Sequence, residues 1–350
     1  MNLAAFAIVT SALASFLLAE LLVLTAARHG RFSMDVPGAI QKFHSQPTPR
    51  IGGIGIYLAL LAASRVLPDA QAGAILGTVL VAGIPALGVG LLEDLTKRVS
   101  VTARLAATVA SGALACWISG AGVTRIDVPV IDTLLAISPI AILFTAFAVG
   151  GVSNAFNIID GFNGLASGTA TLCLLAVACI AALAGDAPLA MAAALVAAAV
   201  TGFWLVNFPW GRLFLGDGGA YFAGFALAWL AVLLPARNAS VSPWASLLVC
   251  AYPIIEVIYS ILRRGANHSS PGDADRGHLH SLVATRVVQR RFASIDPTLQ
   301  NACVSVIMWA CTAVPAVAAI LLHQRSGLLA TCILGCVMAY HFIYRRVART

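Results

Sequence analysis

The sequence predicts an all-α polytopic membrane protein, and two observations support that prediction. Hydrophobic residues make up 60% of the 350 residues, charged residues only 10%, and the mean hydropathy is +0.92. The apolar residues form continuous runs rich in Ala and Leu, and about 20 such residues cross a bilayer as a helix. A β-barrel would instead alternate apolar and polar residues. Composition therefore excludes an ordinary soluble domain.

Eleven apolar segments are expected to cross the membrane as helices, within one integral membrane domain covering residues 1–350. In chain order they are 3–25, 51–68, 72–92, 103–119, 133–150, 165–185, 188–206, 218–236, 243–262, 302–322 and 327–344. The first is too long for the apolar core of a signal peptide and lacks a basic start, so we expect it to be retained. An odd number of crossings places the termini on opposite sides.

The distribution of Lys and Arg predicts the orientation. Seventeen of the 21 lie in one set of loops, in Arg104 beside it, or in the C-terminal tail. These loops are 28–50, 93–102, 151–164, 207–217 and 263–301. Basic residues collect in cytoplasmic loops, so we expect a periplasmic N-terminus and a cytoplasmic C-terminus in a bacterial cytoplasmic (inner) membrane. The formal net charge of +7 is then explained by the basic loops at the membrane surface, and we expect no nucleic acid as a partner.

Every unusual polar cluster falls in these cytoplasmic loops, which are expected to form one active site. The stretch 153–168 contains three Asn, three Gly and Asp160 between two apolar segments. The others are Glu93-Asp94, Asp217 flanked by glycines, and the pair His278 and His280 in a basic loop. Taken singly, each cluster has a simpler interpretation as a turn, a helix cap or a solvated loop, and that alternative stays open. Glu20 and Glu256 are interpreted as interfacial or helix-packing residues.

Together the clusters predict a site for a metal-bound diphosphate. Carboxylates suit a hard cation such as Mg²⁺, which also binds substrate phosphates. Arg and His would offset the charge on the phosphates. Apolar helix faces beside the site would hold a lipid tail.

The motifs resemble one family in their order along the chain. They are Pro47-Thr48-Pro49-Arg50-Ile51-Gly52-Gly53, the acidic pair followed by Arg104, Asn154-x-x-Asn157-x-x-Asp160-Gly161, Phe214-Leu215-Gly216-Asp217, and Asp275-Arg276-x-His278-x-His280. Across nearly the whole chain the sequence resembles the polyprenyl-phosphate N-acetylhexosamine-1-phosphate transferases of glycosyltransferase family 4, which are relatives of the phospho-MurNAc-pentapeptide translocases.

The resemblance implies a reaction and its partners. N-acetylhexosamine-1-phosphate would pass from a UDP-sugar, UDP-GlcNAc or a related UDP-HexNAc, to undecaprenyl phosphate, with release of UMP. The cofactor would be Mg²⁺, with Mn²⁺ as an alternative. The product would initiate O-antigen, capsule or another surface glycan. A homodimer is left open.

The resemblance also implies roles for single residues. The implied catalytic residues are Glu93, Asp94, Asp160, Asp217, His278 and His280, with Asp94, Asp160 and Asp217 as metal ligands. The implied substrate-binding residues are His44, Arg50, Gly53, Arg104, Asn157, Asn163, Asn207, Phe214 and Arg276. Among these, Phe214 would stack on uracil, and Asn163 and Asn207 would contact uridine.

Three departures from the family pattern qualify the prediction. The usual Asp-Asp pair is Glu93-Asp94, Asn163 replaces an Asp, and the run His278-Leu279-His280-Ser281 lacks the last His. The third departure favours the simple-sugar branch over the pentapeptide translocases. A pentapeptide translocase of peptidoglycan synthesis and a non-enzymatic lipid or solute transporter remain the alternatives. Among further alternatives, the chain lacks the Asp-rich motifs of prenyltransferases, and an inactive scaffold stays open.

Overall fold

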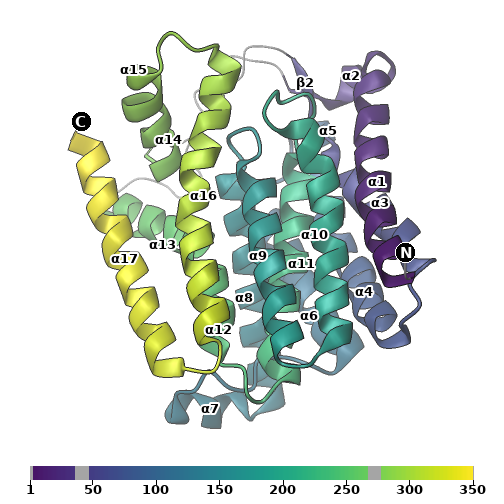
Figure 1. The fold of residues 1–350 in the computed structure, drawn as a ribbon, viewed down its shortest axis with the longest axis vertical. Helices are drawn as coiled ribbons and strands as arrows, with labels where there is room; N and C mark the ends of the chain where they lie inside the picture. The colour runs from purple at the N-terminus through teal and green to yellow at the C-terminus, as the bar shows by residue number, and fades with distance from the viewer. Residues whose placement is uncertain (1–2, 36–46, 267–276, 350) are drawn as a thin grey trace.

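Long helices run side by side through the computed structural model, which describes residues 3–35, 47–266 and 277–349 (Figure 1). In chain order the helices and strands are α1 (Leu3–Leu24), α2 (Ala26–Ser33), β1 (Met34–Asp35), β2 (Thr48–Pro49), α3 (Gly52–Ser64), α4 (Ala70–Ala82), α5 (Ile84–Thr96), α6 (Val101–Ser119), α7 (Pro129–Leu135), α8 (Ser138–Ile159), α9 (Leu165–Leu183), α10 (Ala187–Asn207), α11 (Gly216–Arg237), α12 (Pro243–Val249), α13 (Ala251–Ala266), α14 (Leu279–Val283), the π-helix η1 (Ala284–Val288), α15 (Gln289–Arg291), α16 (Pro297–Leu322) and α17 (Ser326–Arg349). The two short strands pair antiparallel. The all-α class predicted from composition is confirmed.

Each of the eleven predicted segments contains helix, but two of them are not single straight spans. Within the described residues, nine helical stretches are long and apolar enough to cross a membrane, and the bent pair α12 and α13 makes a tenth. The remaining segment, 51–68, holds only the 13 residues of α3. Pro68 disfavours helical geometry at the residue before it, and Asp69 caps α4 instead.

The bend between α12 and α13 measures 74° and has a local cause. Pro253 lacks the N–H that would bond the carbonyl of Val249 one turn earlier. The Val249 carbonyl accepts a hydrogen bond from the Cys173 thiol instead, at 3.1 Å. The bend directs α13 toward the end of the bundle that carries the polar clusters.

Helix α11 is the centre of the bundle, and 83% of its most apolar window is buried. Two glycines at its start allow close packing of its neighbours. A Cβ on Gly53 of α3 would lie 2.4 Å from Gly219, and one on Gly90 of α5 would lie 2.4 Å from Gly218. Small residues permit such backbone-to-backbone approach between membrane helices.

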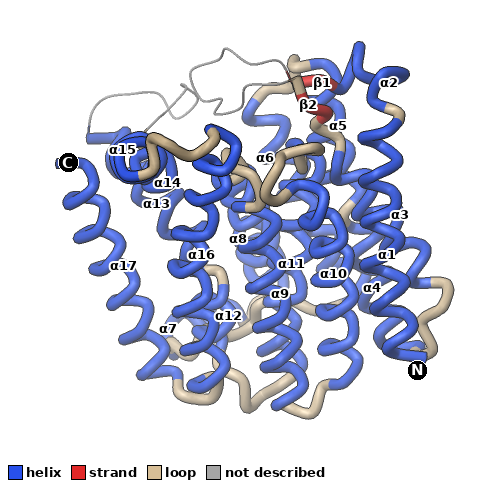
Figure 2. Tube along the Cα trace, turned by 45° about the horizontal axis from the view of Figure 1, so that its top comes forward, coloured by secondary structure: helices blue, strands red, loops and turns tan. Residues whose placement is uncertain are grey.

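All five predicted cytoplasmic loops contain some helix, and two of them show how helices extend into the site. Helix α8 continues through the first half of the predicted loop 151–164 and ends only at Ile159. Helix α5 likewise includes the acidic pair of the predicted loop 93–102. Figure 2 shows the two ends of the described chain at opposite ends of the bundle, with β1, β2, α14 and α15 at the same end as the C-terminus.

Candidate active site

A cavity of about 550 Å³ opens where α8 ends and α11 begins. Its volume is within the range of small-molecule sites. The predicted site residues that line it are Arg50, Arg104, Asn157, Asp160, Asn163, Asn207, Phe214, Asp217, His278 and His280. These residues come from separate loops and helix ends, so the structure brings the predicted clusters together.

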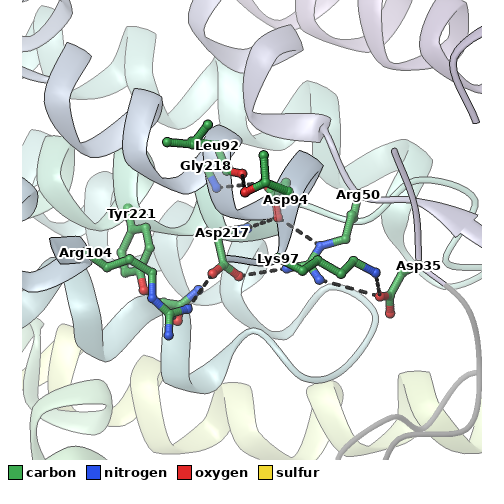
Figure 3. A network of polar contacts seen from close by, with 11 residues as sticks. Asp35, Arg50, Leu92, Asp94, Lys97, Arg104, Asp217, Gly218 and Tyr221 are labelled. Carbon is green, nitrogen blue, oxygen red and sulfur yellow. Dashed lines mark hydrogen bonds and ion pairs between the residues drawn. The ribbon is translucent and has the colours of Figure 1, made fainter. Parts of the chain in front are cut away.

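Asp94 lies beneath the cavity wall, with no exposed surface. Its Oδ1 accepts hydrogen bonds from the backbone N–H of Asp217 and from Arg50 Nε, both at 2.9 Å, and its Oδ2 accepts from the Gly218 N–H at 3.0 Å. Asp94 therefore satisfies two of the N–H groups that a helix start leaves unpaired and offsets the positive end of the α11 dipole. It reaches across from α5, one helix away (Figure 3).

Asp217, in the first turn of α11, is held between two arginines. Arg50 Nη2 donates to its Oδ1 and Arg104 Nη1 donates to its Oδ2, each at 2.9 Å (Figure 3). Asp217 is 13% exposed at the side chain, so the pair of contacts is screened less than a surface ion pair. Among the described residues, the buried Nε of Arg104 has no hydrogen-bond partner. Arg104 also lines the cavity, so its guanidinium places positive charge beside it.

Arg50 connects three carboxylates. Besides Asp94 and Asp217 it contacts Asp35, at 3.5 Å from Nη1, and Lys97 also lies 3.5 Å from the same Asp35 oxygen. Burial disfavours the charged guanidinium, but the three carboxylates outweigh burial and raise the pKa of Arg50 above its usual value. Arg50 thus stays charged and fixes the chain before α3 against the start of α11.

Asp160 directly follows α8 and faces the cavity with part of its surface exposed. Within the described ranges its carboxylate has no hydrogen-bond or ion-pair partner. Burial and the nearby charge of Asp217 raise the pKa of Asp160 to about 8, although Arg50 partly offsets them. The ionised form of a carboxylate in this position would be stabilised by a bound cation or by a hydrogen-bond donor on a ligand.

The loop after Asp160 is held by side chains from two helices. Asn301 Oδ1 on α16 accepts from the Asn163 backbone N–H at 2.7 Å, and Asn207 Oδ1 on α10 accepts from the Gly164 N–H at 2.6 Å. Asn207 Nδ2 donates to the Leu213 carbonyl at 2.8 Å. The loop carrying Asn163 is therefore fixed by the chain itself before any ligand arrives.

The two asparagines predicted to contact uridine differ in the hydrogen bonds that their side chains make within the chain. The side-chain oxygen and the NH₂ group of Asn207 both bond to backbone groups, so Asn207 joins two loops in this structure. Asn163 Nδ2 donates to the Pro209 carbonyl at 2.9 Å, and the residue still lines the cavity next to Phe214. The expectation of nucleotide contact stays a prediction for Asn163 and Phe214.

Three described residues of the predicted site do not line the cavity, and two more predicted residues lie outside the described ranges. Glu93 turns to the loop that follows α5, where its Oε2 accepts from the Val99 N–H at 2.8 Å. Gly53 packs on α11, so close helix packing explains why a residue without a side chain is needed there, and ligand binding is not required to explain it. Asp94 lies beneath the cavity as described above. His44 and Arg276 lie outside the described residues.

The structure adds cavity or network residues that the motifs did not single out: Asp35, Tyr221, Glu256 and Asn301. Tyr221 follows Asp217 by one helical turn and donates its hydroxyl to Asn157 Oδ1 at 3.1 Å. That spacing was a usable signal, since residues four apart share a helix face. Glu256 was interpreted from the sequence as an interfacial or helix-packing residue, but in the structure it accepts hydrogen bonds from His278 and the Leu279 N–H. A carboxylate within an apolar helix was the signal for this, since such residues more often have a function.

The residues can be tested against the predicted divalent cation. Within the ranges that the structure describes, no group of three His, Cys, Asp or Glu side chains is arranged to hold a metal ion. Asp94 does not fit, because it has no exposed surface and both its oxygens accept hydrogen bonds within the chain. Asp160 fits, because it lines the cavity and has no carboxylate partner among the described residues. Both oxygens of Asp217 accept hydrogen bonds from arginines, but Asp217 lines the same cavity, so it would bind a cation by exchanging one of these contacts. Magnesium sites commonly use one or two carboxylates and complete the shell with phosphate and water, so these two residues form an adequate donor set.

Comparisons with known proteins match a part of the chain that includes three of the predicted site carboxylates. Residues 76–235, which include Asp94, Asp160 and Asp217, match the model of glycosyl transferase family 4. The chain is 26% identical over 245 residues to a probable undecaprenyl-phosphate N-acetylglucosaminyl 1-phosphate transferase of Bacillus subtilis, covering 69% of this chain and 66% of the relative.

Two further relatives carry similar names. A decaprenyl-phosphate N-acetylglucosaminephosphotransferase of Mycobacterium tuberculosis is 28% identical over 264 residues, 68% of this chain and 65% of the relative. An undecaprenyl-phosphate alpha-N-acetylglucosaminyl 1-phosphate transferase of Salmonella typhi is 31% identical over 173 residues, 48% of this chain and 47% of the relative. The matches to the first two relatives span slightly less than two thirds of their length. Over residues 76–235 the chain is therefore similar to glycosyl transferase family 4, and the relatives that it resembles are named as polyprenyl-phosphate N-acetylglucosamine-1-phosphate transferases.

Proposed function

We propose that this chain transfers N-acetylhexosamine-1-phosphate from a UDP-sugar to a polyprenyl phosphate and releases UMP. The observation that carries the proposal is the cavity at the start of α11, where Arg50, Arg104 and His278 surround the carboxylates Asp160 and Asp217. Cations and carboxylates arranged around one polar cavity suit a metal-bound diphosphate. The names of the relatives point to N-acetylglucosamine as the sugar and to undecaprenyl phosphate as the acceptor.

In the proposed reaction an oxygen of the lipid phosphate attacks the β-phosphorus of the UDP-sugar. The bond from that phosphorus to the oxygen bridging the two phosphates breaks, and UMP leaves with the electron pair. No strong base is required, because the second pKa of a phosphate monoester is about 6 and most of the lipid phosphate is ionised near neutrality.

The chain's own residues bind and orient the reacting groups. The guanidinium of Arg104 lines the cavity and would bind a phosphate oxygen, and His278 and His280 add ring N–H donors to the same cavity. Phe214 provides an aromatic face for the uracil ring. Mg²⁺, held by Asp160 and Asp217, would supply charge neutralisation of the diphosphate and the leaving UMP.

The proposed orientation places this cavity on the cytoplasmic side of a bacterial inner membrane. The excess of Lys and Arg at this end of the bundle supports it. A nucleotide sugar is a cytoplasmic compound, so the orientation and the donor are consistent. The product would then start a surface glycan on the lipid carrier.

Purified protein in nanodiscs with undecaprenyl phosphate, Mg²⁺ and radiolabelled UDP-GlcNAc tests the proposal. We expect UMP and a lipid-linked sugar to form in equal amounts. Asp217→Asn should lower kcat at least about 100-fold, as loss of one preorganised charged group commonly does. Asp132→Asn is the matched control, because Asp132 lies on α7 at the other end of the bundle and should leave kcat unchanged.

Two results would reject the proposal. In the first, the protein binds both substrates yet forms no UMP from any UDP-HexNAc in a panel. In the second, proteoliposomes move a lipid or solute across the bilayer without chemical change, which would establish the transporter alternative. Transfer from UDP-MurNAc-pentapeptide in place of simple sugars would instead identify a pentapeptide translocase.

A further inference from the structure

The carboxylate of Glu256 lies behind the cavity wall that carries the two histidines. Glu256 is 1% exposed and lies on α13, just beyond the 74° bend. Its Oε1 accepts from His278 Nδ1 at 3.1 Å and from the Leu279 backbone N–H at 3.0 Å. Its Oε2 lies 3.9 Å from His280 Nδ1. One carboxylate thus faces the same edge of both rings.

The two imidazole rings are held in a defined stack. Their centroids lie 5.2 Å apart with an angle of 4° between the planes. Phe162 meets the His280 ring edge-on at 5.7 Å, and the Tyr252 hydroxyl lies 3.5 Å from His280 Nδ1. Because Nδ1 of each ring is directed at Glu256, the Nε2 edge of each ring points away from Glu256. For His280 that edge approaches Gly161, which lines the cavity next to Asp160.

A buried carboxylate is unfavourable unless it is paired, so its presence here needs an explanation. Packing alone would be served better by Leu or Met of similar size. A carboxylate bonded to one ring nitrogen fixes the imidazole tautomer and orientation, and so decides which nitrogen faces a ligand. The hydrogen bond to Leu279 also fixes the backbone between the two histidines.

We propose that Glu256 is a positioning residue that directs the Nε2 atoms of His278 and His280 at the phosphate groups of the substrate. The inference rests on the proposed function for its kinetic consequence, but the ring geometry can be measured independently. Glu256 acts through the histidines and does not itself reach the cavity.

Kinetics of four variants test the proposal: Glu256→Ala, Glu256→Gln, His278→Ala and the double variant Glu256→Ala/His278→Ala. A shift of about 1 Å in a catalytic group can lower the rate about 100-fold, so Glu256→Ala should lower kcat about 10- to 100-fold. Glu256→Gln keeps an acceptor oxygen for His278 and Leu279 and should recover most of that loss. The double variant should be slower than His278→Ala only by the lost support of His280, and therefore less impaired than the two single losses together predict, because Glu256 acts through the histidines.

Additive losses in the double variant would overturn the inference, as would a wild-type kcat in Glu256→Ala. Asp186→Asn serves as the control for a buried carboxylate at the opposite end of the bundle, and we expect it to leave kcat of the folded protein unchanged. If Glu256→Ala does not fold, Glu256→Gln carries the comparison. In that case an unchanged Glu256→Gln and an impaired Glu256→Leu support the proposal, and equal activity of both contradicts it.

Nitrogen NMR of protein labelled with ¹⁵N-histidine separates this inference from the proposed function. In the wild type we expect one His278 tautomer with the proton on Nδ1, and in Glu256→Ala an averaged pair of ring signals. If the wild type releases no UMP but the ring signals change as expected, the proposed function fails and the anchoring stands. If the enzyme is active and the ring signals are the same in both proteins, the inference fails.

Discussion

Replacing Asp94 by Asn separates a structural from a catalytic role for this carboxylate. Asp94 accepts three hydrogen bonds at 2.9–3.0 Å and has no exposed surface. The Asn side chain keeps one acceptor oxygen but turns an NH₂ group toward an N–H donor of α11 or toward Arg50. The variant therefore loses at least one charge-assisted bond and leaves Arg50 with only two carboxylate partners, Asp35 and Asp217.

The expected loss of stability follows from these contacts. Hydrogen bonds to charged groups contribute about 1.5–3 kcal/mol each. The contributions share one residue and do not add, and Arg50 keeps Asp35 and Asp217 as partners, so we expect a loss of about 1.5–3 kcal/mol. At about 2 °C per kcal/mol for a large chain, the midpoint of thermal unfolding in detergent should fall by about 3–6 °C.

Thermal unfolding and UMP release measured on the same preparation test this reasoning. Glu93→Gln is the matched control, because Glu93 precedes Asp94 in α5, faces the adjoining loop, and keeps its acceptor oxygen in the variant. We expect the control to change stability by less than about 0.5 kcal/mol. An Asp94→Asn protein that melts like the wild type but has lost activity would refute the structural role and return Asp94 to the metal or substrate.

Three further predictions concern packing, the fixed loop and pH. Gly53→Ala places a Cβ 2.4 Å from Gly219, so α3 must move away from α11 and stability should fall by about 1–3 kcal/mol in thermal unfolding. Asn301→Ala removes the acceptor that holds the loop after Asp160, and the KM for the UDP-sugar should rise about five- to tenfold with little change in kcat. Asp186 is buried, which opposes its charge, but hydrogen bonds from Arg237 and its neighbours outweigh burial and lower its pKa. Its stabilisation of about 1–2 kcal/mol is therefore present above about pH 4 and lost as pH falls through the lowered pKa, and Asp186→Asn should lose it at neutral pH.

The first two of these predictions have matched controls. Gly73→Ala tests the general effect of adding a Cβ in a helix, because no non-local atom of the described residues lies within 4 Å of that Cβ, and it should stabilise slightly. Gln300→Ala removes the neighbouring amide of α16, whose hydrogen bonds to described residues go to carbonyls of the preceding turn, and it should leave the KM unchanged. For Asp186, equal unfolding midpoints of variant and wild type at pH 7 would contradict the assigned ion pair.

The helices could be predicted from the sequence because the bilayer imposes a length and a composition on each span. Two helices differ from the predicted spans for reasons that cannot be read from a run of apolar residues. The bend at residue 250 depends on Pro253 and on a thiol from α9 that takes up the carbonyl left free. The short α3 depends on Pro68. Whether a proline kinks, ends or leaves intact a membrane helix is decided by the neighbours that satisfy the freed carbonyl.

The candidate site could be located from the sequence but not assembled from it. The basic residues indicated which loops share one side of the membrane, and the polar clusters all lay in those loops. Hydrophobic periodicity gives no information on which loop end meets which, so the contacts of Arg50 with Asp94 and Asp217 were not predictable. In the sequence, a carboxylate at a helix end is equally consistent with a cap, a metal ligand or an ion-pair partner. Its neighbours in three dimensions decide which of these roles it has. For Asp94 they select the cap and the ion pair.

The position of Asp94 also constrains where the phosphates of a substrate bind. A free helix N-terminus is a ready anion site, since its N–H groups and dipole favour negative charge. At the start of α11 the N–H groups of Asp217 and Gly218 are already bonded to Asp94. The cavity beside this helix therefore depends on side chains for anion binding, namely Arg104 and the two histidines. This division explains why the histidine segment needs its own buried support, and it makes the geometry set by Glu256 as important to the proposed reaction as the carboxylates at the start of α11.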